Sequence, residues 1–381
     1  MNPLRILICL DSLAAGGAQR QTVELAKRLD SSQFSLRVVS LHGPRMDLSR
    51  HFSADLTSAG IPLRELDGRW CVSEIPTLTW GILREIRGFR PHLVHSISHH
   101  SNHLTRLLRL LPGSRFRLLT AIRTEYNARQ LRNERLEQWL SHQVVCNSPS
   151  MAAKLREVAG IPASRILYIP NGLDVARFAT PADPGLRRLR SPSAKRVVAM
   201  LARITEQKAP ELLALAVGLL KRTGRLSPDS EFWIVGESDS VATQARLDDA
   251  IREEGLEGIV RQFPATDQPS SVYHAADFTV LASLWEGTPN SVLESLACGR
   301  PVLVSEAANA AGVIHPEVEG WVVPTGTVPA LADRLDACLR LSDSDLASRA
   351  PACRLRASSF DLPTMVQRYA DLYRELCGVG T

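Results

Sequence analysis

Residues 281–301 read LASLWEGTPNSVLESLACGRP, and this stretch holds a strand, a loop and a helix in that order. The apolar run at its start predicts a strand that ends near Ser283. Thr288 is a suitable N-cap for a helix whose first position is Pro289, and Gly299 predicts the end of that helix. A strand that passes through a loop into a helix is the repeating unit of a parallel α/β sheet.

Two glutamates stand out in this stretch. Glu286 lies in the predicted loop and Glu294 lies inside the predicted helix. The unpaired N–H groups of a first helical turn, together with the helix dipole, favour a phosphate or a polar sugar edge. A glutamate beside such a turn can accept hydrogen bonds from sugar hydroxyl groups. Spacing alone leaves open a second interpretation, in which Glu286 is an ordinary loop acid and Glu294 a solvated helix residue.

The same alternation recurs along the whole chain. Apolar strand patterns are separated by helical patterns such as 18–29, 76–88, 104–111 and 151–158. This alternation predicts parallel sheets with helices on both faces, and two such halves predict two doubly wound, Rossmann-like domains. The expected strands are 5–10, 36–41, 63–66, 93–96, 118–122, 143–146 and 166–169 in the first half, and 196–201, 232–235, 260–263, 278–282, 301–304 and 321–323 in the second.

The expected domains are 1–175 and 176–359, followed by a C-terminal segment, 360–381. The link between the domains is irregular and contains Asn171, Gly172, Pro181, Asp183, Pro184 and Gly185. The C-terminal segment predicts one amphipathic helix, with apolar residues at helical spacing: Met365, Tyr369, Leu372 and Tyr373. Parallel open sheets bind ligands beyond the carboxyl ends of their strands, so the expected site is the cleft between the domains.

The composition excludes several classes of protein. The chain has 381 residues, 44% hydrophobic and 22% charged, which excludes a disordered or collagen-like chain and favours two domains. The seven cysteines form no CxxC pair, so the chain predicts neither a disulfide framework nor a structural zinc site, and a cytoplasmic compartment fits better. No apolar run is long enough for a signal-peptide core or a membrane span. The patterns GxGxxG, GxxxxGKS/T, HExxH and GxSxG are absent, which argues against a dinucleotide cofactor, a P-loop ATPase, a metalloprotease and a simple hydrolase.

Positive charge gathers in the first half of the chain. Residues 1–175 carry 23 Lys and Arg against 14 Asp and Glu, a balance of +9, whereas 176–381 carry 22 against 26, a balance of −4. This charge indicates either a solvated surface or a domain that meets an anionic surface or acceptor. No nucleic-acid-binding motif accompanies it, so no nucleic acid partner is expected.

Two helical segments of the first half predict an amphipathic surface. Such a surface could dock on the inner, cytoplasmic face of an anionic membrane without spanning it. In the alternative interpretation, the apolar side chains pack on the sheet and the arginines only solvate it. The residues concerned are Trp80, Ile82, Leu83, Arg84, Arg87, Arg90, Arg106, Leu107, Leu108 and Arg109.

Two further stretches predict anion sites. Gly16 and Gly17 lie between a predicted strand and a predicted helix, where backbone N–H groups can hold an anion, unless the loop is only a tight turn. Arg203 and Lys208 follow a predicted strand of the second half. Two cations at the carboxyl end of a parallel strand suit a diphosphate, unless they are ordinary surface charges.

Two motifs are compatible with a metal but have simpler explanations. His99 and His103 would share one helical face, within a cluster that includes His95 and His100, yet no acid or cysteine nearby in the sequence completes a metal site. We favour the interpretation that one of these histidines lines a polar cleft. The DxD motif at 343–345 lies between two helical patterns without a preceding strand, so it predicts a helix cap. No bound metal is therefore expected.

These stretches occur together and in order, and the sequence resembles the family-4 retaining glycosyltransferases of the GT-B fold over nearly its whole length. Glu286 and Glu294 match the E-x7-E signature of that family, and Arg203 and Lys208 fall on its donor-diphosphate pair. The other similar segments are Gly16-Gly17-Ala18-Gln19, residues 91–102 with His95, His100 and Asn102, Asn147-Ser148, residues 169–174, and the C-terminal helix at 360–376, which in the family crosses back to the first domain.

The resemblance implies a mechanism. A nucleoside diphosphate sugar would lie mainly on the second domain, where Arg203 and Lys208 would neutralise its leaving diphosphate. Glu294 would hold the ribose and Glu286 the donor sugar. The other donor contacts would be Gly16, Gly17, Gly287, Thr288 and Asn290. A glycan or lipid-linked acceptor would bind the first domain, the sugar would be transferred with retention by a same-face displacement, and neither a metal nor another cofactor would be required.

The sequence departs from the family pattern at two places. Tyr126 stands in the loop after strand 118–122, where the family often has a His, and this makes Tyr126 a candidate cleft residue together with His100 and Asn102. Pro264 follows strand 260–263 where the family usually has Gly, which leaves the nucleotide base unassigned. The expected function is sugar transfer in cell-envelope or exopolysaccharide assembly. The alternatives are a GT-B isomerase of nucleotide sugars and a catalytically silent assembly partner, and the intact motifs argue against both.

Overall fold

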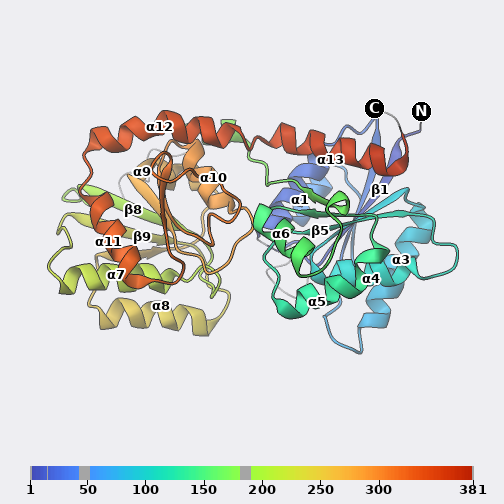
Figure 1. The fold of residues 1–381 in the computed structure, drawn as a ribbon, viewed down its shortest axis with the longest axis horizontal. Helices are drawn as coiled ribbons and strands as arrows, with labels where there is room; N and C mark the ends of the chain where they lie inside the picture. The colour runs from blue at the N-terminus through green and yellow to red at the C-terminus, as the bar shows by residue number, and fades with distance from the viewer. Residues whose placement is uncertain (1, 15, 43–51, 181–189, 380–381) are drawn as a thin grey trace. The chain divides into compact units, whose positions relative to one another are not determined.

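The computed structural model describes residues 2–14, 16–42, 52–180 and 190–379. The chain forms two compact units, one of Met1–Gly172 with Leu362–Thr381 and one of Leu173–Asp361. Figure 1 shows that each unit is a sheet covered by helices. The boundaries lie within three residues of the expected ones. Within the expected link, Pro181, Asp183, Pro184 and Gly185 lie outside the described residues.

The first unit is built on a seven-stranded parallel sheet in the order β3-β2-β1-β4-β5-β6-β7. Its strands are β1 (Leu4–Leu10), β2 (Phe34–Ser40), β3 (Leu63–Glu65), β4 (Leu93–Ile97), β5 (Arg117–Ile122), β6 (Gln143–Cys146) and β7 (Ile166–Tyr168). Its α-helices are α1 (Gly17–Arg28), α2 (Ser53–Ser58), α3 (Ile75–Phe89), α4 (His99–Arg109), α5 (Ala128–Glu137), α6 (Pro149–Glu157) and α13 (Leu362–Cys377).

Both faces of this sheet are covered by helices. Along β1, Ile6 and Ile8 pack in one cluster with residues of α1 and α13, whereas Leu7 and Cys9 pack in another with residues of α3 and α4. Successive side chains of a strand point to opposite faces, so a strand that is buried on both faces consists of apolar residues throughout. This is why the strands are recognisable in the sequence as continuous apolar runs.

The second unit repeats the plan with a six-stranded parallel sheet in the order β10-β9-β8-β11-β12-β13. Its strands are β8 (Arg196–Leu201), β9 (Ser230–Val235), β10 (Val260–Phe263), β11 (Phe278–Leu281), β12 (Val302–Ser305) and β13 (Gly320–Val323). Its α-helices are α7 (Pro210–Arg222), α8 (Val241–Glu253), α9 (Pro269–Ala275), α10 (Asn290–Ala297), α11 (Val328–Leu339) and α12 (Asp343–Ser358). The sequence prediction of every strand in both sheets is confirmed, with bounds that differ by at most two residues.

The C-terminal helix α13 returns to the first unit, where it contacts α1 (Figure 1). Its predicted apolar face is confirmed, because Met365, Tyr369, Leu372 and Tyr373 are all buried. Gly172 marks the place where the chain leaves this unit. A Cβ atom at Gly172 would lie 2.9 Å from Leu362 Cα, so the close approach of the two segments requires glycine there.

Two details of the predicted helices are wrong. Helix α4 begins at His99 and not at residue 104. Its first turn contains the polar but buried residues Ser101 and Asn102, so an apolar pattern does not reveal it. Helix α10 begins at Asn290 with Pro289 as its N-cap, so Thr288 does not cap it. Gly299 does end the helix as predicted: its φ is +72°, and its N–H and that of Arg300 bond to the carbonyls of Leu296 and Ser295.

Candidate active site

The strand order of the second sheet defines where a ligand should bind. Strand β8 lies between β9 and β11, so the connections after β8 and β11 lead to opposite sides of the sheet. Such a switch point is the usual ligand site of an open parallel sheet. Arg203 and Lys208 lie in the loop after β8, and Glu286 lies in the loop after β11. The fold therefore brings together three residues that the sequence predicts for the donor site.

The two loops of the switch point are bonded to each other. Lys208 Nζ donates a hydrogen bond to Glu286 Oε1. The Gln207 side chain donates to the Trp285 carbonyl (2.8 Å), and the Gln207 carbonyl accepts from the Leu284 N–H (2.8 Å). Gln207 was not predicted from the sequence, in which its position beside Lys208 is the one signal that points to it. Gln207 holds the loop of Lys208 against the loop of Glu286.

The cations of this site differ in their surroundings. The side chains of Lys208 and Glu286 are 16% and 7% exposed, so their ion pair is largely shielded from water. Arg203 is exposed, and it forms no ion pair with any residue that the structure describes. Arg203 therefore remains available to an anionic ligand, whereas Lys208 is engaged by Glu286.

Helix α10 presents its amino-terminal end at the same place. Gly287 and Thr288 are buried and Asn290 is half-buried in the segment that enters the helix. Pro289, the N-cap, makes no side-chain cap hydrogen bond and the first turn contains no acid. The first N–H groups of the helix lack intrahelical partners and carry the positive end of the dipole, which suits a phosphate or a sugar oxygen.

Glu294 lies on α10 and is buried. Its Oε2 accepts a hydrogen bond from the hydroxyl of Tyr273 on α9, at 3.0 Å. Tyr273 was not identified from the sequence, because the residues lie on different helices and only the tertiary structure joins them. Tyr273 orients the carboxylate that the E-x7-E resemblance assigns to the ribose.

The first sheet has its own switch point between β1 and β4. Asp11, directly after β1, accepts hydrogen bonds from the backbone N–H groups of Ser101 (2.8 Å) and His100 (3.3 Å) in the first turn of α4. Asp11 thus satisfies the amino-terminal end of α4. Gly16 is the N-cap of α1 and Gly17 its first residue, without a side-chain cap and without an acid in the first turn.

The three candidate acceptor residues have different environments. His100 is partly exposed, lies 3.4 Å from Asp11 Oδ2, and stacks on Trp70 with ring centroids 3.9 Å apart. Burial lowers the pKa of His100 below its usual value, which favours the neutral ring that can bond a hydroxyl group. Asn102 is buried and donates to the Ala121 carbonyl at 3.1 Å. Tyr126 is also buried, and burial raises the pKa of its hydroxyl. Direct acceptor contact by these residues stays a prediction, and His100 is the best placed of the three.

The remaining histidines of the cluster have separate partners. His95 Nδ1 lies 2.7 Å from the hydroxyl of Tyr373, and His99 packs edge-on against Tyr126. His103 Nδ1 lies 2.7 Å from Glu137 Oε1, and this hydrogen bond raises the pKa of His103. Among the described residues no three His, Cys, Asp or Glu side chains are grouped as metal ligands would be.

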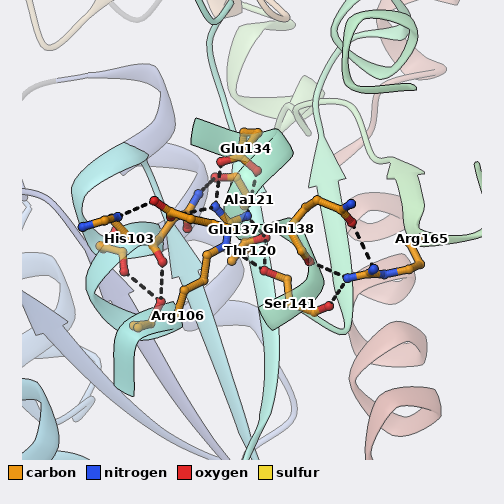
Figure 2. Close-up of polar contacts among 12 residues, drawn as sticks. His103, Arg106, Thr120, Ala121, Glu134, Glu137, Gln138, Ser141 and Arg165 are labelled. Atoms are coloured by element: carbon orange, nitrogen blue, oxygen red, sulfur yellow. Dashed lines mark hydrogen bonds and ion pairs between the residues drawn. The ribbon is translucent and has the colours of Figure 1, made fainter. Parts of the chain in front are cut away.

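Figure 2 shows the polar cluster around His103 and the buried Arg106. The guanidinium of Arg106 binds both carboxylate oxygens of Glu134, at 2.8 and 2.7 Å, and donates to Ser141 Oγ at 2.9 Å. Glu137 lies 3.6 Å from the same guanidinium. Removing one partner of such a buried pair costs about 3–5 kcal/mol. The cluster joins α4 to α5 and, through a bond from Arg106 to Thr120 Oγ1, to β5, and so holds the second half of α4 in place.

The DxD motif at 343–345 has the structural role that the sequence predicts. Asp345 and Ser342 form a capping box at the start of α12, with each side chain bonding the backbone N–H of the other. Asp343 forms an ion pair with Arg196. The prediction of a helix cap is confirmed.

Two segments that resemble family motifs meet at Arg123. Its guanidinium donates to Asn171 Oδ1 (2.8 Å) and to the Tyr369 hydroxyl (3.0 Å), and its carbonyl accepts from Asn147 Nδ2 (3.1 Å). Gln21 completes the junction by bonding both the N–H and the carbonyl of Gly172, each at 2.8 Å. These residues connect the segment at Asn171 and Gly172, where the chain leaves the first unit, to α1 and α13.

Two family models match the chain. The model described as Glycosyltransferase Family 4 matches residues 15–177, and the model described as Glycosyl transferases group 1 matches residues 186–350. The first match lies mainly in the first unit and the second match in the second unit, and together they include every site residue predicted from the sequence. The chain belongs to glycosyltransferase family 4. Neither an isomerase nor a catalytically silent partner is favoured for this family-4 glycosyltransferase, since its curated relatives are glycosyltransferases.

Two relatives match this glycosyltransferase over nearly its full length. D-inositol 3-phosphate glycosyltransferase of Thermobispora bispora is 26% identical and covers 95% of this chain and 90% of its own. GDP-mannose:cellobiosyl-diphosphopolyprenol alpha-mannosyltransferase of Xanthomonas oryzae is 26% identical and covers 96% and 94%.

The fold of this glycosyltransferase is shared with solved structures. HepE of Anabaena, in complex with UDP and glucose, has a TM-score of 0.83 and 19% identity and covers 98% of this chain and 100% of its own. Sucrose-phosphate synthase of Thermosynechococcus elongatus also has a TM-score of 0.83 and 19% identity, covering 99% and 100%. The chain has the GT-B fold, as expected. Across the part of the chain that the structure describes, no helix is both long and apolar enough to span a membrane.

Proposed function

We propose that this glycosyltransferase moves a sugar from a nucleoside diphosphate sugar to a lipid-linked or glycan acceptor, with retention of configuration and without a metal. The observation that carries the proposal is the pairing of Lys208 with Glu286 at the switch point of the second sheet, beside the first turn of α10, which contains no acidic residue. A cation, a carboxylate and a helix amino-terminus there suit a diphosphate and a sugar bound side by side.

In this mechanism the diphosphate leaves toward Arg203 and Lys208. Their hydrogen bonds to the phosphate oxygens strengthen as negative charge develops on the leaving group, and therefore they lower the barrier. Glu286 faces the sugar and stabilises positive charge at the anomeric carbon. Glu294, oriented by Tyr273, accepts hydrogen bonds from the ribose. Arg203, Lys208 and the α10 dipole supply the positive charge that a metal would otherwise supply, which is why we propose a metal-independent reaction with no further cofactor.

The nature of the acceptor is proposed from the relatives. The Xanthomonas oryzae relative is named for a cellobiosyl-diphosphopolyprenol acceptor, and an Escherichia coli galactosyltransferase, 27% identical over 56% of this chain, for a diphosphoundecaprenol-linked acceptor. An Erwinia amylovora relative is named for amylovoran biosynthesis. We therefore place this enzyme in the assembly of a cell-envelope or secreted polysaccharide. The first unit would bind the acceptor, and it would contact the cytoplasmic face of the anionic membrane from outside the bilayer.

The test is a transfer assay with a panel of nucleoside diphosphate sugars and synthetic diphosphoprenol-linked mono- and disaccharide acceptors. We expect one donor to give a product whose new anomeric centre has the configuration of the donor, as read by nuclear magnetic resonance. Inversion would overturn the retaining mechanism. Conversion of the donor into another nucleotide sugar without an acceptor would support an isomerase, and binding without any turnover would support a silent partner.

A further inference from the structure

The first unit contains a cavity that the donor and acceptor sites do not use. It lies at the end of the sheet where β1, β4 and β5 begin, and its volume is about 1000 Å³. It is bounded by the end of α3, by the segment 111–117 that follows α4, and by Cys377 of α13. Strand β1 is seven residues long, so roughly 20 Å separates its start from its carboxyl end. The cavity is therefore remote from Asp11 and His100, which lie at the carboxyl ends of the same strands.

The lining of this cavity is strongly basic. We call it the basic basin and define it by Arg5, Arg87, Arg90, His92, Arg115 and Arg117. None of the described residues that line it is acidic. Within the described parts of the chain its five arginines form no ion pair, whereas Arg106 and Arg37 of the same unit are paired with glutamates. Among the residues that the structure describes, the basin is thus a concentration of positive charge without a paired carboxylate.

The positive charge of the basin affects the pKa values of two basic groups in or beside it. Burial and the neighbouring Arg5 lower the pKa of His92 below its usual value, and burial and Arg117 lower the pKa of Arg109. Specific contacts nevertheless hold two of these arginines in place. Arg5 Nε donates to the Arg90 carbonyl at 2.8 Å, and Arg90 takes a left-handed conformation with φ of 51°. Guanidinium groups gathered without carboxylates match the oxygens of a phosphate group.

Apolar side chains adjoin the basic ones. Leu83, Ile86 and Phe116 contribute to the wall of the basin, and at its rim Leu110 and Leu111 are 56% and 40% exposed. Trp80, farther along α3, is 59% exposed, with the Arg84 guanidinium over its ring. A small dissolved phosphate would leave these apolar side chains in water, whereas a lipid surface would cover them and offer phosphate groups to the arginines.

We propose that the basic basin binds the phosphate group of an anionic membrane lipid. The choice of a lipid as the source of the phosphate rests on the proposed function, in which the first unit contacts a membrane. The basin takes the place of the amphipathic surface that the sequence predicted for membrane docking. Of the residues of that surface, Ile82, Arg106 and Leu108 are buried and cannot contact a membrane. The membrane would then meet the amino-terminal edge of the sheet.

The test compares two variants that lose the same charge. One carries Arg87→Ser, Arg115→Ser and Arg117→Ser in the basin. The other carries Arg129→Ser, Arg132→Ser and Arg135→Ser on α5, where the three arginines are exposed and, like those of the basin, have no ion pair among the described residues. Each is sedimented with vesicles of phosphatidylcholine alone and of equal parts phosphatidylcholine and phosphatidylglycerol.

We expect the unchanged enzyme to bind the mixed vesicles and not the neutral ones. Each arginine near an anionic surface contributes about fivefold in affinity, so the basin variant should bind about a hundredfold more weakly. The α5 variant should stay within a few-fold of the unchanged enzyme. Equal weakening of both variants would show diffuse attraction and overturn the proposal, and so would the absence of binding to anionic vesicles at low salt.

A further arm separates a lipid from a dissolved phosphate. Inorganic phosphate and pyrophosphate should shift the melting temperatures of the basin variant and of the unchanged enzyme by the same amount, because the basin is proposed to bind phosphate only as part of a lipid. A stabilisation that only the unchanged enzyme shows, without vesicle binding, would assign the basin to a soluble anion and overturn the lipid. Because the basin lies away from the donor residues, vesicle binding without sugar transfer would refute the proposed function and leave this inference standing.

Discussion

Lys208 donates a hydrogen bond to Glu286, which lies 78 residues farther along the chain. The two side chains come from the loops that follow β8 and β11, the neighbouring strands at the switch point of the second sheet. In the proposed mechanism the diphosphate and Glu286 share the Lys208 ammonium. The ion pair keeps Lys208 in place before the donor binds, and part of its hydrogen bonding is transferred to the leaving phosphate.

The diphosphate pair is tested by Arg203→Ala and Lys208→Ala. Each should lower turnover by roughly a hundredfold or more, or about 3 kcal/mol, because charge-assisted bonds to the leaving group are strongest in the transition state. Only Lys208→Ala should also lower the melting temperature, since it leaves buried Glu286 without its cation, whereas Arg203 is exposed. Arg252→Ala, at an exposed position of α8, is the control. Normal turnover in both site variants would refute the assignment.

Substitutions of Glu286 and Glu294 should have different effects on nucleotide binding and on turnover. Glu286→Gln should lower transfer by about a hundredfold and leave nucleoside diphosphate affinity at least as high as before, because Lys208 loses its competing partner. Glu294→Gln should weaken nucleotide binding by about tenfold through its ribose contact. Calorimetric titration with the nucleoside diphosphate measures both affinities. Equal losses of affinity would mean that the two roles are wrongly placed.

His95 should make the first unit sensitive to acid. Burial lowers the pKa of His95 to about 3, from an ordinary value near 6.5. The folded form therefore excludes a proton that the unfolded chain binds, and stability is full above about pH 6.5 and falls as the pH falls toward 3. Between pH 7.5 and pH 5 this group should remove about 2 kcal/mol from the free energy of unfolding.

Denaturant titrations at the two pH values measure this loss. His95→Asn should lose about 2 kcal/mol less than the unchanged chain over the same interval. His142, whose pKa burial lowers to about 4, titrates in the same direction and stays in both proteins, so its contribution cancels in the comparison. An identical pH dependence of the two proteins would refute the assignment to His95.

Gly172→Ala should destabilise the junction of the first unit with α13. The added Cβ would lie 2.9 Å from both Leu362 Cα and Met365 Cβ, so the helix must shift, at a cost of about 1–3 kcal/mol. Gly88→Ala is the matched control, because nothing lies within 4 Å of its Cβ position on α3 and alanine favours a helix. Thermal unfolding should show a loss for the first variant and none for the second. The contrary result would mean that the segments are not closely packed.

The DxD motif should matter for stability and not for transfer. Ser342→Ala removes the N-cap of α12 and should cost about 1 kcal/mol. Asp345→Ala should retain turnover, and transfer by the unchanged enzyme should persist in EDTA, because Arg203, Lys208 and the α10 dipole provide the positive charge. If EDTA abolished transfer and Asp345→Ala did the same, the mechanism would have to include a metal at this motif.

Local patterns were sufficient for the strands and for the helices whose ranges the sequence predicted, apart from some of their ends. Strands such as β1 and β8 are covered on both faces, so their apolar runs are visible without knowledge of their neighbours. The start of α4 could not be predicted in this way. Ser101 and Asn102 are polar yet buried, because the Ser101 hydroxyl donates to the carbonyl of Ile97 on β4 and the Asn102 amide to that of Ala121 on β5. Thr288 was misplaced as a cap because Pro289 already occupies that position in extended conformation.

The sequence by itself determined the two parallel sheets, the break near Gly172, the amphipathic C-terminal helix and the residue types of the donor site. These follow from apolar periodicity and from motifs within a few residues of one another. Only the tertiary structure decided that Lys208 is paired with Glu286 and that Tyr273 holds Glu294. It alone also shows that five arginines with no ion pair to any described residue gather where β1, β4 and β5 begin. The physical reason is that hydrogen bonds and uncompensated charge depend on distances between elements far apart in the chain, which local spacing does not contain.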